Sequence, residues 1–257
     1  MSLDKASAII LHSRKHGETS KILSLFTRQF GKLSLMAKGS RSIKSRHLGA
    51  LEPYNHISLV FYRKESRDIQ YLREVDIIDS FPGVHQQLGK MVLAAIACEI
   101  VEKTEALGHV NPELFRLLLD VLRALETATS GQKNIIRAFL LKFFRLYGLA
   151  PELRQCAKCG REDAGERLYF SFSDGVFSCD FCGAIDGPVF EMSTLTMQYL
   201  RWFDRSPLSR ASEAKVTKNI GQIIDNFLLT YLRYQIEGLK TLKSIQHLAQ
   251  LQETLDS

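Results

Sequence analysis

Two matched cysteine pairs constrain the fold of this chain more than any other feature of its sequence. They are Cys156-Ala157-Lys158-Cys159-Gly160 and Cys179-Asp180-Phe181-Cys182-Gly183, and 19 residues separate them. Two residues between the thiols let both sulfurs reach one ion across a tight turn, and the glycine behind each pair lets the backbone turn beneath it. The spacing is that of four-cysteine zinc sites. We therefore expect the chain to fold back and bring all four sulfurs together.

The residues between the pairs can provide this return. Apolar residues 168–172, a Ser173-Asp174-Gly175 turn and a second stretch at 176–178 form the pattern of a β-hairpin. Four thiolates complete a tetrahedron and leave no place for water, so we expect one structural Zn²⁺ and no catalytic metal. An iron–sulfur cluster is the open alternative, because four thiolates suit it as well. Disulfides or a redox site fit less well, since nothing indicates an oxidising compartment and a redox C-x-x-C usually stands alone.

The net charge of +6 is concentrated in the first third of the chain. Residues 1–80 hold 14 Lys and Arg against 8 Asp and Glu, and the remaining residues hold 20 of each. Between His12 and His47 a single acid, Glu18, faces nine basic residues, which are Arg14, Lys15, Lys21, Arg28, Lys32, Lys38, Arg41, Lys44 and Arg46. This asymmetry is typical of a protein that binds a polyanion, although a solvated basic face would have the same composition.

Several classes of protein are disfavoured. No apolar run approaches the roughly 20 residues of a membrane span, and the N-terminus lacks a signal-peptide pattern, so we expect a cytoplasmic protein with reduced thiols and no membrane partner. No serine–histidine–acid pattern, phosphate-binding glycine loop or H-x-E metal motif occurs. We therefore predict no enzymatic activity and no small-molecule substrate.

The periodicity changes from strands to helices near residue 81. Short strands are predicted at 8–11, 21–27, 32–37, 57–62 and 68–75, and five strands in so short a stretch indicate a small barrel. Such a barrel with a basic surface is typical of the oligonucleotide-binding (OB) fold. Helical patterns follow at 84–107, 112–127, 133–147, 193–203 and 212–234, with a polar tail at 240–257. Cys98 lies among apolar residues of the first helix and is expected to be a buried core thiol.

The predicted fold is therefore mixed α+β. It has an N-terminal five-stranded OB-fold barrel (1–80), a helical domain in two parts (81–153 and 186–257) and an inserted four-cysteine zinc module (154–185).

Three stretches of the sequence carry a resemblance to the RecO recombination mediators of bacterial DNA repair, and together they span nearly the whole chain. The first is Gly17-Glu18-Thr19-Ser20, Leu25-Phe26-Thr27-Arg28, Gly31-Lys32-Leu33-Ser34 and Ala37-Lys38-Gly39; the second is Gly49-Ala50-Leu51-Glu52-Pro53 with Ser80-Phe81-Pro82; the third is Arg145-Leu146-Tyr147-Gly148-Leu149-Ala150-Pro151-Glu152-Leu153 leading into Cys156.

The resemblance implies a function and partners. It implies binding of single-stranded and double-stranded DNA, annealing of complementary strands and assistance to a recombinase on DNA covered by single-strand-binding protein. The implied partners are RecR and the acidic tail of single-strand-binding protein, in the bacterial cytoplasm and nucleoid. Some members of that family lack the cysteines, and this chain retains all four.

The residues expected to contact DNA lie in the basic segment. A loop between two predicted strands carries Lys38, Arg41, Lys44 and Arg46, which would bind phosphates and release counterions, and Arg14 and Lys15 precede it. Tyr62 is a candidate for base stacking. Phe26 and Tyr54 are further candidates, with Phe26 better placed as a core residue. The competing interpretation is a helical protein-interaction scaffold that binds nucleic acid only incidentally. A zinc enzyme acting on nucleic acid would require an open metal position.

Overall fold

Alternating apolar residues in the first 80 residues of the computed structural model form five strands. The structure describes residues 2–42, 49–162, 165–239 and 241–245. The strands are β1 (Ser2–His16), β2 (Ser20–Thr27), β3 (Gly31–Ala37), β4 (His56–Arg63) and β5 (Ile69–Asp79). Their order is β1-β2-β3-β5-β4, and β4 pairs back onto β1, so the sheet closes into a barrel. All pairings are antiparallel except β3 with β5.

The barrel interior is filled by the apolar residues of the alternating pattern. Ile57, Leu59 and Phe61 point inward from β4 and share the barrel core with Leu23 of β2 and Leu35 of β3. β1 is much longer than the predicted strand at 8–11, since its ends pair with β2 and β4. The alternation thus assigns one face of each strand to the core and leaves the other face for the surface.

Three helices belong to the same compact unit as the barrel, which comprises Met1–Thr127 and Leu242–Ser257. They are α1 (Pro82–Gln86), α2 (Leu88–Thr104) and α3 (Pro112–Thr127). The prediction of one continuous helix over 84–107 is wrong, because Gln87 is extended (φ −117°, ψ 109°) and separates α1 from α2. Cys98 is buried in α2, as expected.

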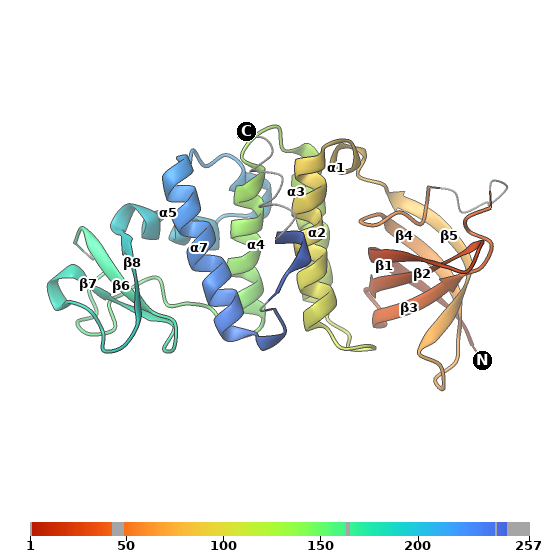
Figure 1. The fold of residues 1–257 in the computed structure, drawn as a ribbon, viewed down its shortest axis with the longest axis horizontal. Coiled ribbons are helices and arrows are strands. Elements are labelled where there is room, and N and C mark those ends of the chain that lie inside the picture. The colour runs from red at the N-terminus through yellow and green to blue at the C-terminus, as the bar shows by residue number, and fades with distance from the viewer. Residues whose placement is uncertain (1, 43–48, 163–164, 240, 246–257) are drawn as a thin grey trace. The chain divides into compact units, whose positions relative to one another are not determined.

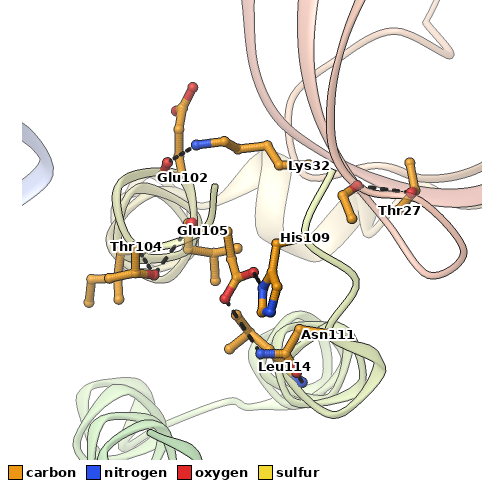
Figure 2. A network of polar contacts seen from close by, with 11 residues as sticks. Thr27, Lys32, Glu102, Thr104, Glu105, His109, Asn111 and Leu114 are labelled. Atoms are coloured by element: carbon orange, nitrogen blue, oxygen red, sulfur yellow. Dashed lines mark hydrogen bonds and ion pairs between the residues drawn. The ribbon is translucent and has the colours of Figure 1, made fainter. Parts of the chain in front are cut away.

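Polar contacts join the turn between β2 and β3 to the connection between α2 and α3 (Figure 2). The Lys32 ammonium donates to the carbonyl of Glu102, and the N–H of Gly108 donates to the carbonyl of Lys32 at 3.0 Å. On the connection itself, the buried carboxylate of Glu105 lies 2.8 Å from Nδ1 of His109. Asn111 caps α3 by accepting from the N–H of Leu114 at 3.0 Å. The barrel and the helices that follow it are therefore connected by defined hydrogen bonds.

The second unit, Ala128–Thr241, combines helices with a small sheet. Its helices are α4 (Gln132–Leu146), α5 (Thr194–Arg205), α6 (Leu208–Ala211) and α7 (Lys218–Gln235), and its strands are β6 (Arg167–Ser171), β7 (Val176–Cys179) and β8 (Val189–Ser193). β6 and β7 form the predicted hairpin. β8, which was not predicted, pairs with the other side of β6 (Figure 1).

Aromatic rings attach the small sheet to α7. Phe170 lies 4.8 Å from Phe227 and 5.7 Å from Tyr231, measured between ring centroids. The predicted helix at 212–234 begins later than expected, because Thr217 caps α7. Of the polar tail at 240–257, Lys240 and residues 246–257 lie outside the described part of the chain. No helix within the described residues has both the length and the apolar run required to cross a bilayer.

Candidate metal centre and nucleic-acid interface

The four cysteines of the two pairs converge on one point, as the sequence predicts. Cys156 and Cys159 belong to the segment between α4 and β6, Cys179 ends β7, and Cys182 lies on the 3₁₀ turn Asp180–Cys182. All four Sγ atoms lie within 4.8 Å of one another, and those of Cys159 and Cys179 are 3.7 Å apart. The hairpin β6–β7 produces this convergence by returning the second pair beside the first.

This donor set fits a tetrahedral metal. Zinc–sulfur bonds of about 2.3 Å place the sulfurs of a tetrahedron about 3.8 Å apart, close to the separation of Cys159 and Cys179. The N–H of Cys179 donates to Sγ of Cys156 at 3.3 Å, the kind of hydrogen bond that supports a metal-bound thiolate. All four sulfurs would hold the ion, and a closed set of four gives it a structural role.

The pKa values of the thiols are also consistent with a cation at the centre of the cluster. Burial raises the pKa of Cys156, but hydrogen bonds from backbone N–H groups of both pairs outweigh it and lower the pKa to about 6. The pKa of Cys182 rises to about 12, chiefly because its sulfur lies against those of Cys159 and Cys179. Without a cation the neighbouring sulfurs therefore oppose the ionisation of Cys182, and a divalent ion reverses that effect.

Backbone geometry keeps the two pairs in place. Gly160 (φ +72°) and Gly183 (φ +69°) adopt the left-handed conformation directly behind each pair, where an L side chain would be strained. The Lys158 ammonium donates to the carbonyl of Ala184 at 2.9 Å, which joins the first pair to the segment behind the second. The N–H of Ala157 donates to the carbonyl of Phe177 at 2.9 Å. The centre is thus attached to the sheet by main-chain contacts.

The structure describes five of the seven residues expected to bind DNA, and these five lie on or beside the barrel. Arg14 and Lys15 are exposed near the end of β1, and Tyr62 is half-buried on β4. Lys38 and Arg41 are exposed just after β3. Lys44 and Arg46 lie in the segment 43–48, outside the described residues.

One of these residues has a structural task within the barrel. The N–H of Arg41 donates to the carbonyl of Thr19 at 2.8 Å, and its guanidinium donates to the carbonyls of Gly17 and Glu18 at 3.1 Å and 2.9 Å. Arg41 therefore fixes the turn between β1 and β2 against the loop after β3. The remaining guanidinium donors of Arg41 are compatible with a phosphate.

The strand register aligns a row of five residues across the barrel, of which Ile22 is buried. Arg14 pairs with Ile22, Ile22 with Met36, Met36 with Tyr71, and Tyr71 with Tyr62. Directly opposed residues share a face of a sheet, and the neighbouring residues Leu23, Leu35 and Phe61 point to the core. The row therefore runs over the outer face, with Arg14 at one end and two tyrosines at the other. Phe26 is fully buried against Phe115, so it is a core residue and no platform for bases.

Two residues of this surface were missed by sequence reasoning. Tyr71 lies on β5 with the Lys38 ammonium 4.8 Å from its ring centroid, and the Arg67 guanidinium lies 5.4 Å from the same point. Their proximity depends on the parallel pairing of β3 with β5, which joins strands far apart in the chain. The position of Tyr71 opposite Met36 follows from that pairing, and no local pattern in the sequence reports it.

Comparison with known proteins covers almost the whole chain. The family model described as "Recombination protein O N terminal" matches residues 1–81, and "Recombination protein O C terminal" matches residues 85–244. A protein named "DNA repair protein RecO" from Pelotomaculum thermopropionicum is 34% identical over 92% of this chain and 91% of its own length. Proteins of the same name from Rubrobacter xylanophilus and Bacillus subtilis are 32% and 29% identical, over 84% and 96% of this chain and 86% and 97% of their own lengths.

Proposed function

Because the chain belongs to the RecO family of DNA repair proteins, we propose that it is a DNA-binding recombination mediator. In this proposal it binds single-stranded and double-stranded DNA and anneals complementary strands. It also assists loading of a recombinase onto DNA covered by single-strand-binding protein. These activities are those that the family resemblance implies.

The observation that best supports DNA binding is the charge of the barrel region. All six excess positive charges of the chain lie in residues 1–80, the segment that forms the barrel. A closed five-stranded barrel in which β1 pairs with both β2 and β4 is compatible with the OB fold, whose members bind oligonucleotides on their outer strands and loops. We assign the nucleic-acid site to this barrel.

The proposed contacts follow from the chemistry of each side chain. Basic side chains bind phosphates and release condensed counterions, a contribution that does not depend on sequence. Tyr62, at the end of the outer row, provides a ring on which an unpaired base stacks. Annealing requires two backbones held close with their charge neutralised, and no covalent step. The proposed DNA-binding residues are Arg14, Lys15, Lys38, Arg41, Lys44, Arg46 and Tyr62.

The remaining assignments concern the metal, the partners and the location. One structural Zn²⁺ bound by Cys156, Cys159, Cys179 and Cys182 would stabilise the small sheet of the second unit. We assign RecR and the acidic tail of single-strand-binding protein as protein partners, and the cytoplasm and nucleoid as the location. In this account the chain has no catalytic activity, no membrane contact and no small-molecule substrate.

Annealing of complementary strands tests the proposal directly. We expect the full chain to accelerate annealing of two labelled oligonucleotides, both free and covered with single-strand-binding protein, and to do so less as salt increases. The variant Lys38→Glu, Arg41→Glu, Lys44→Glu should lose most of this acceleration. A control with the same charge change, Arg205→Glu, Lys215→Glu, Arg233→Glu, alters exposed residues of the second unit and should retain it.

Each contrary outcome has a definite meaning. Equal loss in both variants would show that the effect depends on net charge and not on the barrel surface. No acceleration by the unaltered chain, together with firm binding of protein partners, would favour the interaction scaffold over the mediator.

A further inference from the structure

Two cations from different loops of the barrel share one aromatic ring. Lys38 follows β3, Arg67 precedes β5, and the charged groups of both lie within 5.4 Å of the Tyr71 ring centroid. The parallel pairing of Met36 with Tyr71 places the ring beside the end of β3. A tyrosine ring attracts cations through its negative face, so Tyr71 favours the presence of both charges.

Neither cation is neutralised by an acid among the described residues. The ion pairs of the barrel involve Lys21, Arg63 and Arg73, and none includes Lys38 or Arg67. Glu65 and Asp68 flank Arg67 in sequence, yet neither forms an ion pair with it in the described structure. Two like charges are therefore held at one ring without a counter-charge from the described residues.

An anion bound by both charged groups would supply the missing counter-charge. A phosphodiester suits the site, because a guanidinium and an ammonium from two loops can contact different oxygens of one phosphate. The neighbouring row supports a nucleic acid in particular. Tyr62 lies directly opposite Tyr71 on β4, so a ring for an unpaired base is one strand away from the paired cations.

We infer that Lys38 and Arg67, positioned by Tyr71, form a binding site for a backbone phosphate of nucleic acid. This inference rests on the proposed DNA-binding function and adds the loop between β4 and β5 to the interface. Arg67 contacts the phosphate directly. Tyr71 is a positioning residue that keeps both cations in place before DNA arrives, which lowers the ordering cost of binding.

Binding of a single-stranded oligonucleotide by the full chain, measured across a salt series, separates these roles. Lys38→Ala and Arg67→Ala should each weaken binding several-fold and reduce the slope of log affinity against log salt by about 0.7. Tyr71→Leu removes the ring but no charge and should weaken binding about 3- to 10-fold, whereas Tyr71→Phe should bind within 2-fold of the unaltered chain. In the Tyr71→Leu background, Arg67→Ala should cost less than it does alone.

A purely structural role for Tyr71 would give a different result. Tyr71→Leu would then lower the melting temperature, and Arg67→Ala would cost the same with or without the ring. Unchanged DNA affinity in Arg67→Ala would overturn the inference while leaving the proposed function intact if the unaltered chain still binds DNA with a steep salt slope. Failure of the unaltered chain to bind DNA would remove the proposed function itself.

The test also distinguishes ligand classes. An acidic peptide and inorganic phosphate are measured as alternative ligands with the same variants. Loss of peptide binding in Arg67→Ala, with DNA binding unchanged, would assign the paired cations to a protein partner and overturn the phosphate site.

Discussion

Gly31 shows how one residue determines the contact between the barrel and the helices that follow it. It adopts φ +64° in the turn between β2 and β3, and a Cβ atom placed there would lie 1.9 Å from the carbonyl oxygen of His109. Only glycine permits so close an approach of two backbones. The hydrogen bond from Gly108 to Lys32 and the adjoining network depend on that approach.

Gly31→Ala should therefore destabilise the protein strongly. Left-handed strain and the clash with His109 together should cost about 3 kcal/mol or more, measured as the free energy of unfolding in urea. Gly17→Ala is the matched control, since Gly17 has a similar φ of +58° but open space around its Cβ position. That control should cost only about 1 kcal/mol. Equal costs for the two variants would contradict the close contact.

His56 makes the stability of the barrel sensitive to mild acid. Its ring is buried, Nε2 pairs with the Ser7 hydroxyl at 2.8 Å, and Nδ1 has no partner among the described residues. Burial lowers the pKa of His56, the charge of Arg123 lowers it further, and Asp79 opposes both. Below the ordinary histidine pKa the unfolded chain then takes up a proton that the folded chain does not, so stability falls as the pH falls.

We expect this residue to contribute a pH-dependent loss of at most about 1.4 kcal/mol between pH 7.5 and pH 5.5. Urea unfolding at both pH values measures the loss. His56→Gln removes the titrating group, so its stability should depend less on pH in that interval, although its absolute stability is lower. His12→Gln, at an exposed position, should behave like the unaltered chain. A pH dependence unchanged by His56→Gln would assign the effect to other groups.

At this scale, prediction from sequence succeeds where the pattern is local. The cysteine pairs specify their own turns, so their convergence follows from spacing and from the hairpin between them. Arg67 and Tyr71 were not found, because their relation to Lys38 arises from the parallel β3–β5 pairing. Arg41 was predicted as a DNA contact, but its bonds to the neighbouring turn depend on tertiary structure.

Among whole elements, apolar periodicity identifies the existence of helices and strands better than their ends. The long apolar pattern over 84–107 contains no proline that would mark the extended Gln87, and so α1 and α2 are predicted as one helix. α7 was expected from Ser212, but Thr217 provides the cap and the chain turns before it. By contrast, α5 begins where predicted because Ser193 caps it by accepting from the N–H of Thr196 at 3.2 Å.

The small sheet of the second unit holds the candidate metal site. Its three strands are short, and four thiols occupy one end of it. Because metal binding and local folding are coupled in such modules, loss of one ligand should unfold the region around the cysteines.

Cys156→Ser should abolish stoichiometric zinc and lower the free energy of unfolding by several kcal/mol. Zinc content by elemental analysis and thermal unfolding by circular dichroism measure the two effects. Cys98→Ser provides the control, because Cys98 is a buried thiol of α2 that takes no part in the cluster. It should retain one zinc per chain. A Cys156→Ser protein with full zinc content and an unchanged melting temperature would contradict a structural site.

In the molecule as a whole, the excess positive charge and the candidate metal site lie in different units. The barrel region has all the excess positive charge, and the four cysteines lie in the other unit. The two features that sequence reasoning identified first therefore serve different purposes in this account. In the proposed function, a metal bound by the four cysteines would stabilise its own unit, and the barrel surface would attract a polyanion through many weak contacts that salt screens.

The most direct test of this account is the salt dependence of single-stranded DNA binding by the full chain. About four phosphate contacts on the barrel predict that log affinity falls linearly with log salt, with a slope of about −3. Lys38→Glu, Arg41→Glu, Lys44→Glu should flatten the slope markedly, while the control triple variant in the second unit should leave it unchanged. An affinity that does not respond to salt, or a slope that is the same in both variants, would contradict a DNA site on the barrel.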